Sequence, residues 1–97
     1  MKDAVTKEVR ELFRALLSLG TEEECAAFLE DICTVKEMRD LAQRLEVARM
    51  LSCGEKYKKI EEVTGASTVT ISRVKRSLDY GSGGYAMVLD RLAGEGE

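Results

Sequence analysis

Apolar side chains recur at every third or fourth position along most of the chain, which is the spacing of one face of an α-helix. The first such segment runs from about Asp3 to Leu19, and Gly20 follows as a helix-ending residue. Its apolar positions are Val5, Val9, Leu12, Phe13, Leu16 and Leu17. Because no segment shows the alternation typical of a β-strand, the pattern predicts an all-α fold.

A second helix is expected directly after Gly20. Thr21 and Glu24 have the spacing of a capping box, in which the hydroxyl and the carboxylate each accept a free N–H at the helix start. The apolar residues that follow again keep helical spacing: Cys25, Phe28, Leu29 and Ile32. The first two helices are therefore joined by almost no loop.

The third helix should begin at a second capping box, Thr34 with Glu37, and continue to about Ser52 before Gly54. Its apolar residues spread well beyond one stripe: Met38, Leu41, Ala42, Leu45, Val47, Ala48, Met50 and Leu51. A helix with so wide an apolar surface is expected to be buried on more than one side. In a chain of 97 residues, a second subunit is the expected cover.

The elements after Gly54 are shorter. Two helices are predicted over about 55–63 and about 68–78, with inward residues Tyr57, Ile60, Val63, Ile71, Val74 and Leu78. The glycine-rich stretch "DYGSGG" (79–84) marks a chain reversal. A last helix should then carry Tyr85, Val88, Leu89 and Leu92 on one face and fray in "AGEGE".

The two short helices are separated by "VTGAS" (63–67), the arrangement of a helix-turn-helix unit. Gly65 supplies the backbone conformation of the turn, and Ser67 or Thr68 can cap the second helix. The residues that then point outward are small hydroxyl, apolar and cationic: Ser67, Thr68, Val69, Ser72, Arg73 and Arg76, with Thr70 partly inward and Lys75 at the flank. Such a surface suits the major groove of DNA, with arginines reaching phosphates or guanine.

Charge is distributed unevenly along the chain. Residues 49–76 hold seven cations and three anions, whereas residues 1–48 hold seven and eleven, and the net charge of the chain is −3. The basic segment favours one localised polyanion site, with Lys58 and Lys59 beside the flanking DNA backbone. A capped threonine-rich helix with a solvated basic face is the plainer alternative.

Composition excludes several other classes. The chain has no histidine, and its three cysteines form no CxxC pair, so neither a zinc site nor a Cys–His catalytic pair is expected. Cys25, Cys33 and Cys53 are interpreted as reduced and mostly buried. Without an apolar run long enough for a membrane span, we expect a cytoplasmic bacterial protein, at the nucleoid when bound to DNA, that is not an enzyme.

Residues 41–78, "LAQRLEVARMLSCGEKYKKIEEVTGASTVTISRVKRSL", resemble the Trp repressor superfamily, most closely its short members of the YerC/YecD type. The blocks "QRLEVARML" and "GASTVTISRVKR" carry the likeness, which extends over about 20–93. The resemblance implies a six-helix, Trp-repressor-like fold as an intertwined homodimer. One domain would then span 1–97, with the helix-turn-helix at about 55–78 and dimerisation helices at about 3–52 and 84–93.

The resemblance also implies a position for a ligand. The family's tryptophan pocket maps onto Thr34, Arg44, Arg73 and Ser77, and the two arginines match those that enclose the indole. Where the family has glycine after the second arginine, this chain has Val74. Because a valine side chain would enter the space of the ring, we expect no cofactor and no tryptophan corepressor. The arginines have a plainer interpretation too: Arg44 pairing with Glu37, Asp40 or Glu46, and Arg73 serving DNA.

Two functions follow from these observations. The favoured one is a sequence-specific, DNA-binding transcriptional regulator, a repressor by resemblance, whose homodimer places two recognition helices in successive major grooves of double-stranded DNA. The alternative is a helical protein-interaction module that contacts the transcription machinery through its acidic first 48 residues.

Overall fold

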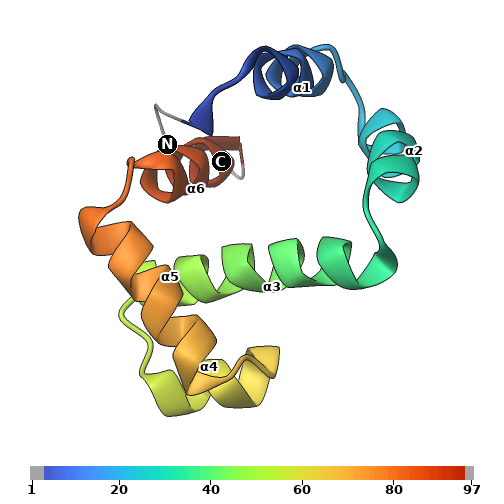
Figure 1. Cartoon of the computed structure of the whole chain (residues 1–97). Coiled ribbons are helices and arrows are strands. Elements are labelled where there is room, and N and C mark those ends of the chain that lie inside the picture. Colours follow the sequence, from blue (N-terminus) through green and yellow to red (C-terminus); the bar gives the residue numbers. More distant parts are fainter. Residues whose placement is uncertain (1–3, 96–97) are drawn as a thin grey trace. The chain divides into compact units, whose positions relative to one another are not determined.

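The computed structural model describes residues 4–95 and contains six α-helices in that range, with no strand (Figure 1). The helices are α1 (Lys7–Leu17), α2 (Glu22–Ile32), α3 (Val35–Ser52), α4 (Tyr57–Thr64), α5 (Thr68–Tyr80) and α6 (Gly84–Glu95). The predicted all-α class is confirmed. The chain divides into two compact units, residues 1–38 and residues 39–97, and α3 runs through the boundary.

The helix starts of the first unit are set by side-chain caps. Thr6 caps α1, because its hydroxyl accepts from the Val9 N–H at 3.2 Å. The helix therefore begins later than the expected Asp3, which lies outside the described residues. It ends at Leu17, close to the predicted position.

The two predicted capping boxes differ in detail. At Thr34, both hydrogen bonds form: the Glu37 N–H donates to the Thr34 hydroxyl (3.0 Å), and the Thr34 N–H donates to the Glu37 carboxylate (2.9 Å). At Thr21, the hydroxyl accepts from the Glu24 N–H at 3.1 Å, but the Glu24 carboxylate accepts from Gly20 at 2.7 Å. The Glu24 carboxylate therefore accepts a hydrogen bond from the connection between α1 and α2, instead of from the Thr21 N–H as predicted.

The hydrophobic core lies in the second unit. It consists of Val47, Ala48, Met50, Ile60, Ala66, Ile71 and Val74, with Leu51, Leu78, Tyr85 and Leu89 packed against it. The predicted inward positions Ile60, Ile71 and Val74 are confirmed. The inward positions predicted for Tyr57 and Val63 are wrong, because these side chains are 37% and 58% exposed. Ala66, in the turn after Val63, is buried instead.

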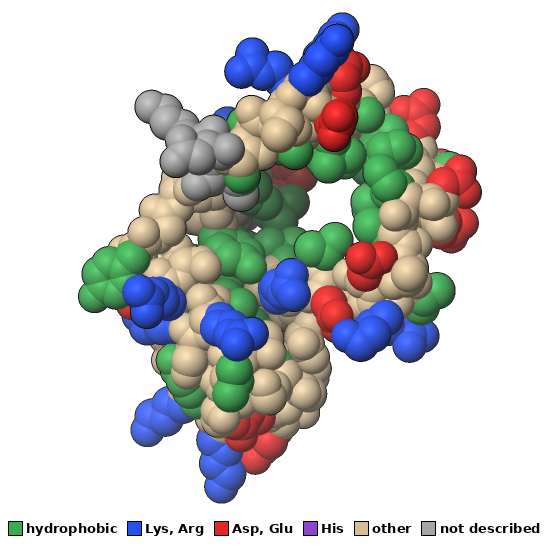
Figure 2. Space-filling model, in the orientation of Figure 1, with side chains coloured by type: hydrophobic (Ala, Val, Ile, Leu, Met, Phe, Trp, Pro, Cys, Tyr) green, Lys and Arg blue, Asp and Glu red, His purple; other side chains and the backbone are tan. Residues whose placement is uncertain are grey.

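Within residues 4–95 of this single chain, the wide apolar surface of α3 is only partly covered. Val47, Ala48 and Met50 are buried, but Leu41 is half exposed. Likewise, α1 and α2 contain no buried residue, although both carry apolar faces (Figure 2). The prediction of mostly buried cysteines is also wrong, because Cys25 and Cys53 are exposed and only Cys33 is partly covered.

Candidate nucleic-acid interface

Hydrogen bonds made by three residues hold the turn between α4 and α5. Gly65 adopts φ 73°, in the left-handed region, and its N–H donates to the Glu61 carbonyl at 2.9 Å. The Thr64 hydroxyl donates to the Ile60 carbonyl (2.7 Å) and accepts from the Ala66 N–H (3.1 Å). From α3, the Gln43 amide donates to the Thr64 carbonyl at 3.1 Å. The angle between the two helices is thereby fixed by local hydrogen bonds as well as by the core.

Two hydroxyl residues that were predicted to face DNA, Ser67 and Thr70, form hydrogen bonds at the start of α5. The Ser67 hydroxyl caps the helix by accepting from the Thr70 N–H at 3.1 Å, and it lies 3.2 Å from the Thr70 hydroxyl. Ser67, not Thr68, is therefore the N-cap. Thr70 is half-buried, as expected for a partly inward position.

The outward face of α5 brings five of the predicted residues together. They line a shallow groove of about 430 Å³, here called the outer groove: Thr68, Val69, Ser72, Arg73 and Arg76. All five are exposed, whereas Ile71 and Val74 on the opposite face are buried. A helix that is anchored on one side and bears hydroxyls, a methyl surface and guanidinium groups on the other has the chemistry of base and phosphate contact.

The predicted lysines lie outside this groove. Lys75 forms an ion pair with Asp79 one turn later, with its ammonium 2.8 and 2.9 Å from the two carboxylate oxygens. The hydrogen bond to Asp79 raises the pKa of Lys75 above its ordinary value. Lys58 and Lys59 are exposed on α4. Figure 2 shows cationic side chains over α4 and α5 and acidic ones gathered on α2.

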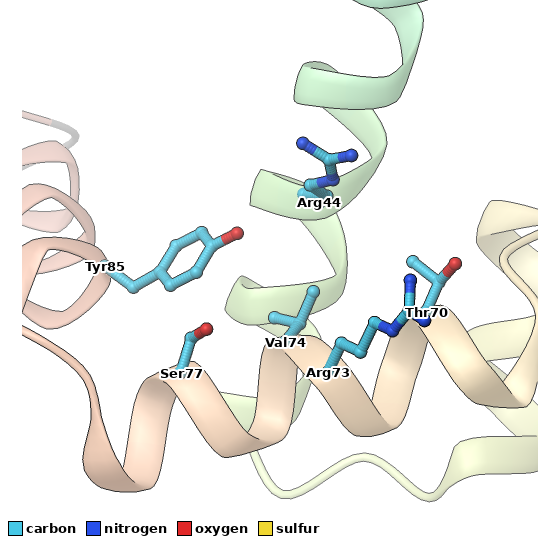
Figure 3. A pocket seen from close by; sticks show the side chains of 6 residues that line it. All are labelled: Arg44, Thr70, Arg73, Val74, Ser77 and Tyr85. Atoms are coloured by element: carbon cyan, nitrogen blue, oxygen red, sulfur yellow. The ribbon is translucent and has the colours of Figure 1, made fainter. Parts of the chain in front are cut away.

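A second concavity lies on the other side of α5. This inner cavity, of about 310 Å³, is lined from three helices by Arg44 of α3, by Tyr85 of α6 and, from α5, by Thr70, Arg73, Val74 and Ser77. In Figure 3 the Tyr85 hydroxyl points towards Arg44, and Val74 stands between the Tyr85 and Arg73 side chains. Four predicted pocket residues thus meet here: Arg44, Arg73, Val74 and Ser77. Thr34, the fifth, belongs to the first unit, where its hydroxyl caps α3.

Two of the lining residues were not assigned to a pocket by the sequence. Tyr85 was expected only as an apolar contact of the last helix, and Thr70 only as a DNA-facing residue. The signal for Tyr85 was available, because a tyrosine on an otherwise aliphatic face presents a hydroxyl that needs a polar neighbour.

Of the three acids expected beside Arg44, Glu46 pairs elsewhere. The Glu46 carboxylate accepts from the Arg49 guanidinium, with the Nε–Oε2 distance at 3.0 Å, and this hydrogen bond lowers the pKa of Glu46. The interaction joins neighbours on one turn of α3 and leaves the inner cavity with two guanidinium groups.

Other kinds of site are not found in the described range. Residues 4–95 contain no group of three histidine, cysteine or carboxylate side chains placed to hold a metal ion. None of the described helices is long and apolar enough to cross a membrane.

The fold and the exposed, basic second helix of the turn unit define an all-α helix-turn-helix protein. The family model for Trp repressor protein matches residues 7–93, and the chain belongs to this family. It is 59% identical over 86 residues to the uncharacterised protein YerC of Bacillus subtilis, covering 89% of this chain and 83% of YerC.

Two solved structures have the same fold. One is a crystal structure described as a candidate Trp repressor from Staphylococcus aureus, with a TM-score of 0.92, 49% identity, and 95% of this chain and 92% of that chain covered. The other is a TrpR-like protein from Eubacterium eligens, with a TM-score of 0.92, 49% identity and 96% of both chains covered. The predicted family and its six-helix fold are confirmed.

Val74, the residue for which the resemblance predicted no tryptophan corepressor, lies at the inner cavity. Val74 is only 4% exposed, packs in the core and lines the cavity between its two arginines.

Proposed function

We propose that this protein is a sequence-specific, DNA-binding transcriptional regulator, most simply a repressor, that acts as a homodimer. The observation that carries the proposal is the division of α5 into two faces. Ile71 and Val74 are locked in the core, while Thr68, Val69, Ser72, Arg73 and Arg76 line the outer groove. A rigidly held helix is what base readout in a major groove requires.

The residues of α5 would make different contacts with DNA along the length of the helix. Thr68, Val69 and Ser72, in the first half of α5, have side chains short enough to bring the helix close to base edges, and threonine and valine methyls suit the thymine methyl. Arg73 and Arg76 follow and are long enough to reach guanine or phosphate. Ser67 and Thr70 would contribute chiefly through the cap that fixes the first turn. Lys58, Lys59 and Lys75 would supply flanking contacts to the backbone.

Dimerisation is supported by apolar surface that this chain does not cover. In α1, Leu12, Phe13 and Leu16 are 37–42% exposed, and in α6, Met87, Val88 and Leu92 are 39–48% exposed. Exposed apolar surface on this scale is typical of an interface. In helix-turn-helix dimers, the Trp repressor among them, the two recognition helices enter successive major grooves about 34 Å apart. A pseudo-palindromic operator follows from the two-fold axis.

The test is a titration of duplex DNA with the wild type and the double variant Arg73→Gln/Arg76→Gln. We expect the wild type to lose affinity steeply between about 50 and 200 mM salt, and the double variant to lower the slope of log K against log [salt] by roughly 2. The matched control, Lys7→Gln/Arg10→Gln on α1, removes the same charge and should bind as the wild type. Salt-independent binding, or equal loss in the control, would favour the protein-interaction module instead.

We further propose that L-tryptophan is not the corepressor, because Val74 fills the space between the arginines of the inner cavity. Calorimetry should detect no saturable binding of L-tryptophan to the wild type. Val74→Gly should bind it measurably, with Val74→Ala intermediate as the variant that keeps helix propensity. Micromolar binding to the wild type that Val74→Gly does not improve would refute the steric argument.

A further inference from the structure

Asp79 is the one acidic residue of α5, the helix that is proposed to dock on DNA. The same helix carries three cations, Arg73, Lys75 and Arg76. DNA is a polyanion, and each phosphate that a cation neutralises adds to affinity because counterions are released. A carboxylate on α5 opposes this attraction, so its presence needs a physical reason.

The Asp79 carboxylate engages one of the three cations. Its two oxygens accept from the Lys75 ammonium, one turn earlier on α5, at distances of 2.8 and 2.9 Å. The hydrogen bond also raises the pKa of Lys75 above its ordinary value. Within the described part of the chain, Arg73 and Arg76 have no carboxylate partner and line the outer groove. Asp79 therefore neutralises Lys75 and leaves the two arginines free for DNA.

The ion pair lies at the edge of the surface that is proposed to face DNA. Thr68, Ser72, Lys75 and Asp79 follow one another at spacings of four, three and four residues, which places them along one edge of the helix. The first two of these residues also line the outer groove. The side chains of Lys75 and Asp79 are 47% and 42% exposed, so a DNA phosphate can approach the ammonium. The pair thus stands where the DNA backbone would flank a docked helix.

Helix stability gives no good reason for an acid at position 79. Exposed ion pairs contribute little and are weakened by salt. A lysine that precedes its acid by four residues is the weaker of the two possible orders on a helix. Asp79 also lies in the last turn of α5, where the helix dipole disfavours a negative charge. All three effects indicate that the residue does not stabilise α5, and they point to a role in binding.

We propose that Asp79 limits sequence-independent binding to DNA by holding the Lys75 ammonium away from backbone phosphates. The inference rests on the proposed function, because it requires that α5 docks on DNA. With Lys75 neutralised, affinity depends mainly on the outer groove, where short side chains and two arginines can meet base edges. Asp79 is then a residue that restrains affinity without itself contacting DNA.

The expected effect follows from what one phosphate contact contributes. One additional contact steepens the fall of log K with log [salt] by about 0.9, which corresponds to roughly 5-fold in affinity near 0.15 M salt. We therefore expect Asp79→Asn to bind a mixed-sequence duplex about 5-fold more tightly than the wild type, with the steeper salt slope. Asp79→Glu keeps a carboxylate that can reach Lys75 and should behave as the wild type.

The experiment is a fluorescence-anisotropy titration of a mixed-sequence duplex at several salt concentrations with the 97-residue chain. It compares the wild type, Asp79→Asn, Lys75→Gln and the double variant. Most of the gain from Asp79→Asn should vanish in the Lys75→Gln background, because no ammonium is left to release. The matched control, Asp90→Asn, makes the same substitution at an exposed position of α6 and should bind as the wild type. Thermal unfolding should show Asp79→Asn to be no less stable than the wild type.

Several results would overturn the proposal. Weaker binding or an unchanged salt slope in Asp79→Asn would show that Asp79 does not hold Lys75 back. An equal gain in the Lys75→Gln background would mean that Asp79 acts on DNA through its own charge alone. Joint loss of stability and affinity in Asp79→Asn would make the pair a structural element of α5. Each of these results leaves the proposed function standing, whereas a wild type and variants that bind no duplex would overturn both.

Discussion

The two compact units differ in how far they bury their apolar side chains. In the second unit, Val47, Ile60 and Ile71 are completely buried, and they join α3, α4 and α5 into one core. In the first unit, α1 and α2 have helical apolar faces of the same kind, yet neither helix contains a buried residue. The helix-turn-helix therefore has its own source of stability, whereas the first two helices depend on a surface that this unit does not supply.

The difference separates the recognition element from the proposed dimerisation element. Full burial of an aliphatic side chain stabilises a fold by about 1.5–3 kcal/mol, so a core of seven residues can hold α5 in place. Leu16 and Leu17, 42% and 84% exposed, gain little in the single chain. Three variants and one pH dependence test this contrast, in order of decreasing expected effect.

The largest effect should come from Ile60→Ala in the second unit. Removing a completely buried isoleucine side chain costs about 2–5 kcal/mol, through lost transfer energy and the cavity left behind. Urea unfolding followed by circular dichroism measures the change. Val63→Ala, on the same helix but 58% exposed, is the matched control and should cost far less. Equal losses would mean that the core lies elsewhere.

Leu16→Glu in the first unit should leave the second unit folded and disrupt the proposed dimer. A carboxylate placed in an apolar interface is strongly penalised, and we expect the dimer dissociation constant to rise at least about 30-fold. Sedimentation equilibrium at several protein concentrations measures it. Lys7→Gln lowers the net charge by the same one unit at an exposed polar position of α1 and should leave the proposed dimer intact. An unchanged dimer in Leu16→Glu would remove α1 from the interface.

Thr34→Ala should have a smaller effect, because it removes one cap. The Thr34 hydroxyl accepts from the Glu37 N–H at 3.0 Å, and loss of such a cap costs about 1 kcal/mol. Thr34→Ser keeps the hydroxyl and should restore most of the stability in thermal unfolding. Equal stability of Thr34→Ala and the wild type would contradict a stabilising role of this cap.

The smallest effect should be the pH dependence carried by Glu46. Its folded-state pKa is lowered by the hydrogen bond from Arg49, so its contribution is present at neutral pH and is lost as pH falls below about 4. Because the pair is exposed to solvent, the contribution is small and weakened by salt. Unfolding of the wild type and Glu46→Gln should differ slightly at about pH 6 and converge at about pH 3. A difference that grows in acid would contradict the assigned sign.

Much of the fold was predictable because it depends on local chemistry. The Thr34 box, Gly65 in the turn and the cap at Ser67 are encoded by residues three or four positions apart. The first two appear where the sequence placed them, and Ser67 is one of the two residues that the sequence offered as the cap. Periodicity identifies the apolar face of a helix but not whether the chain itself covers that face. For this reason Val63 and the faces of α1 and α2 are more exposed than expected.

The candidate site was predicted in part for the same reason. The outward residues of α5 follow from its period, and Arg44, Val74 and Ser77 were assigned to a pocket through the family resemblance. The Lys75–Asp79 pair was missed although its i,i+4 spacing was visible in the sequence. Tyr85 could not be placed in the cavity from spacing alone, because its position depends on how α6 packs against the core.

The most direct test of the central claim is a selection of bound duplexes from random DNA by the 97-residue wild type. The account predicts an enriched pseudo-palindrome whose half-sites lie about 34 Å, one helical turn, apart, and a changed preference within each half-site for Ser72→Ala. Recovery of random sequence, with affinity unaffected by salt, would contradict the claim that α5 reads DNA.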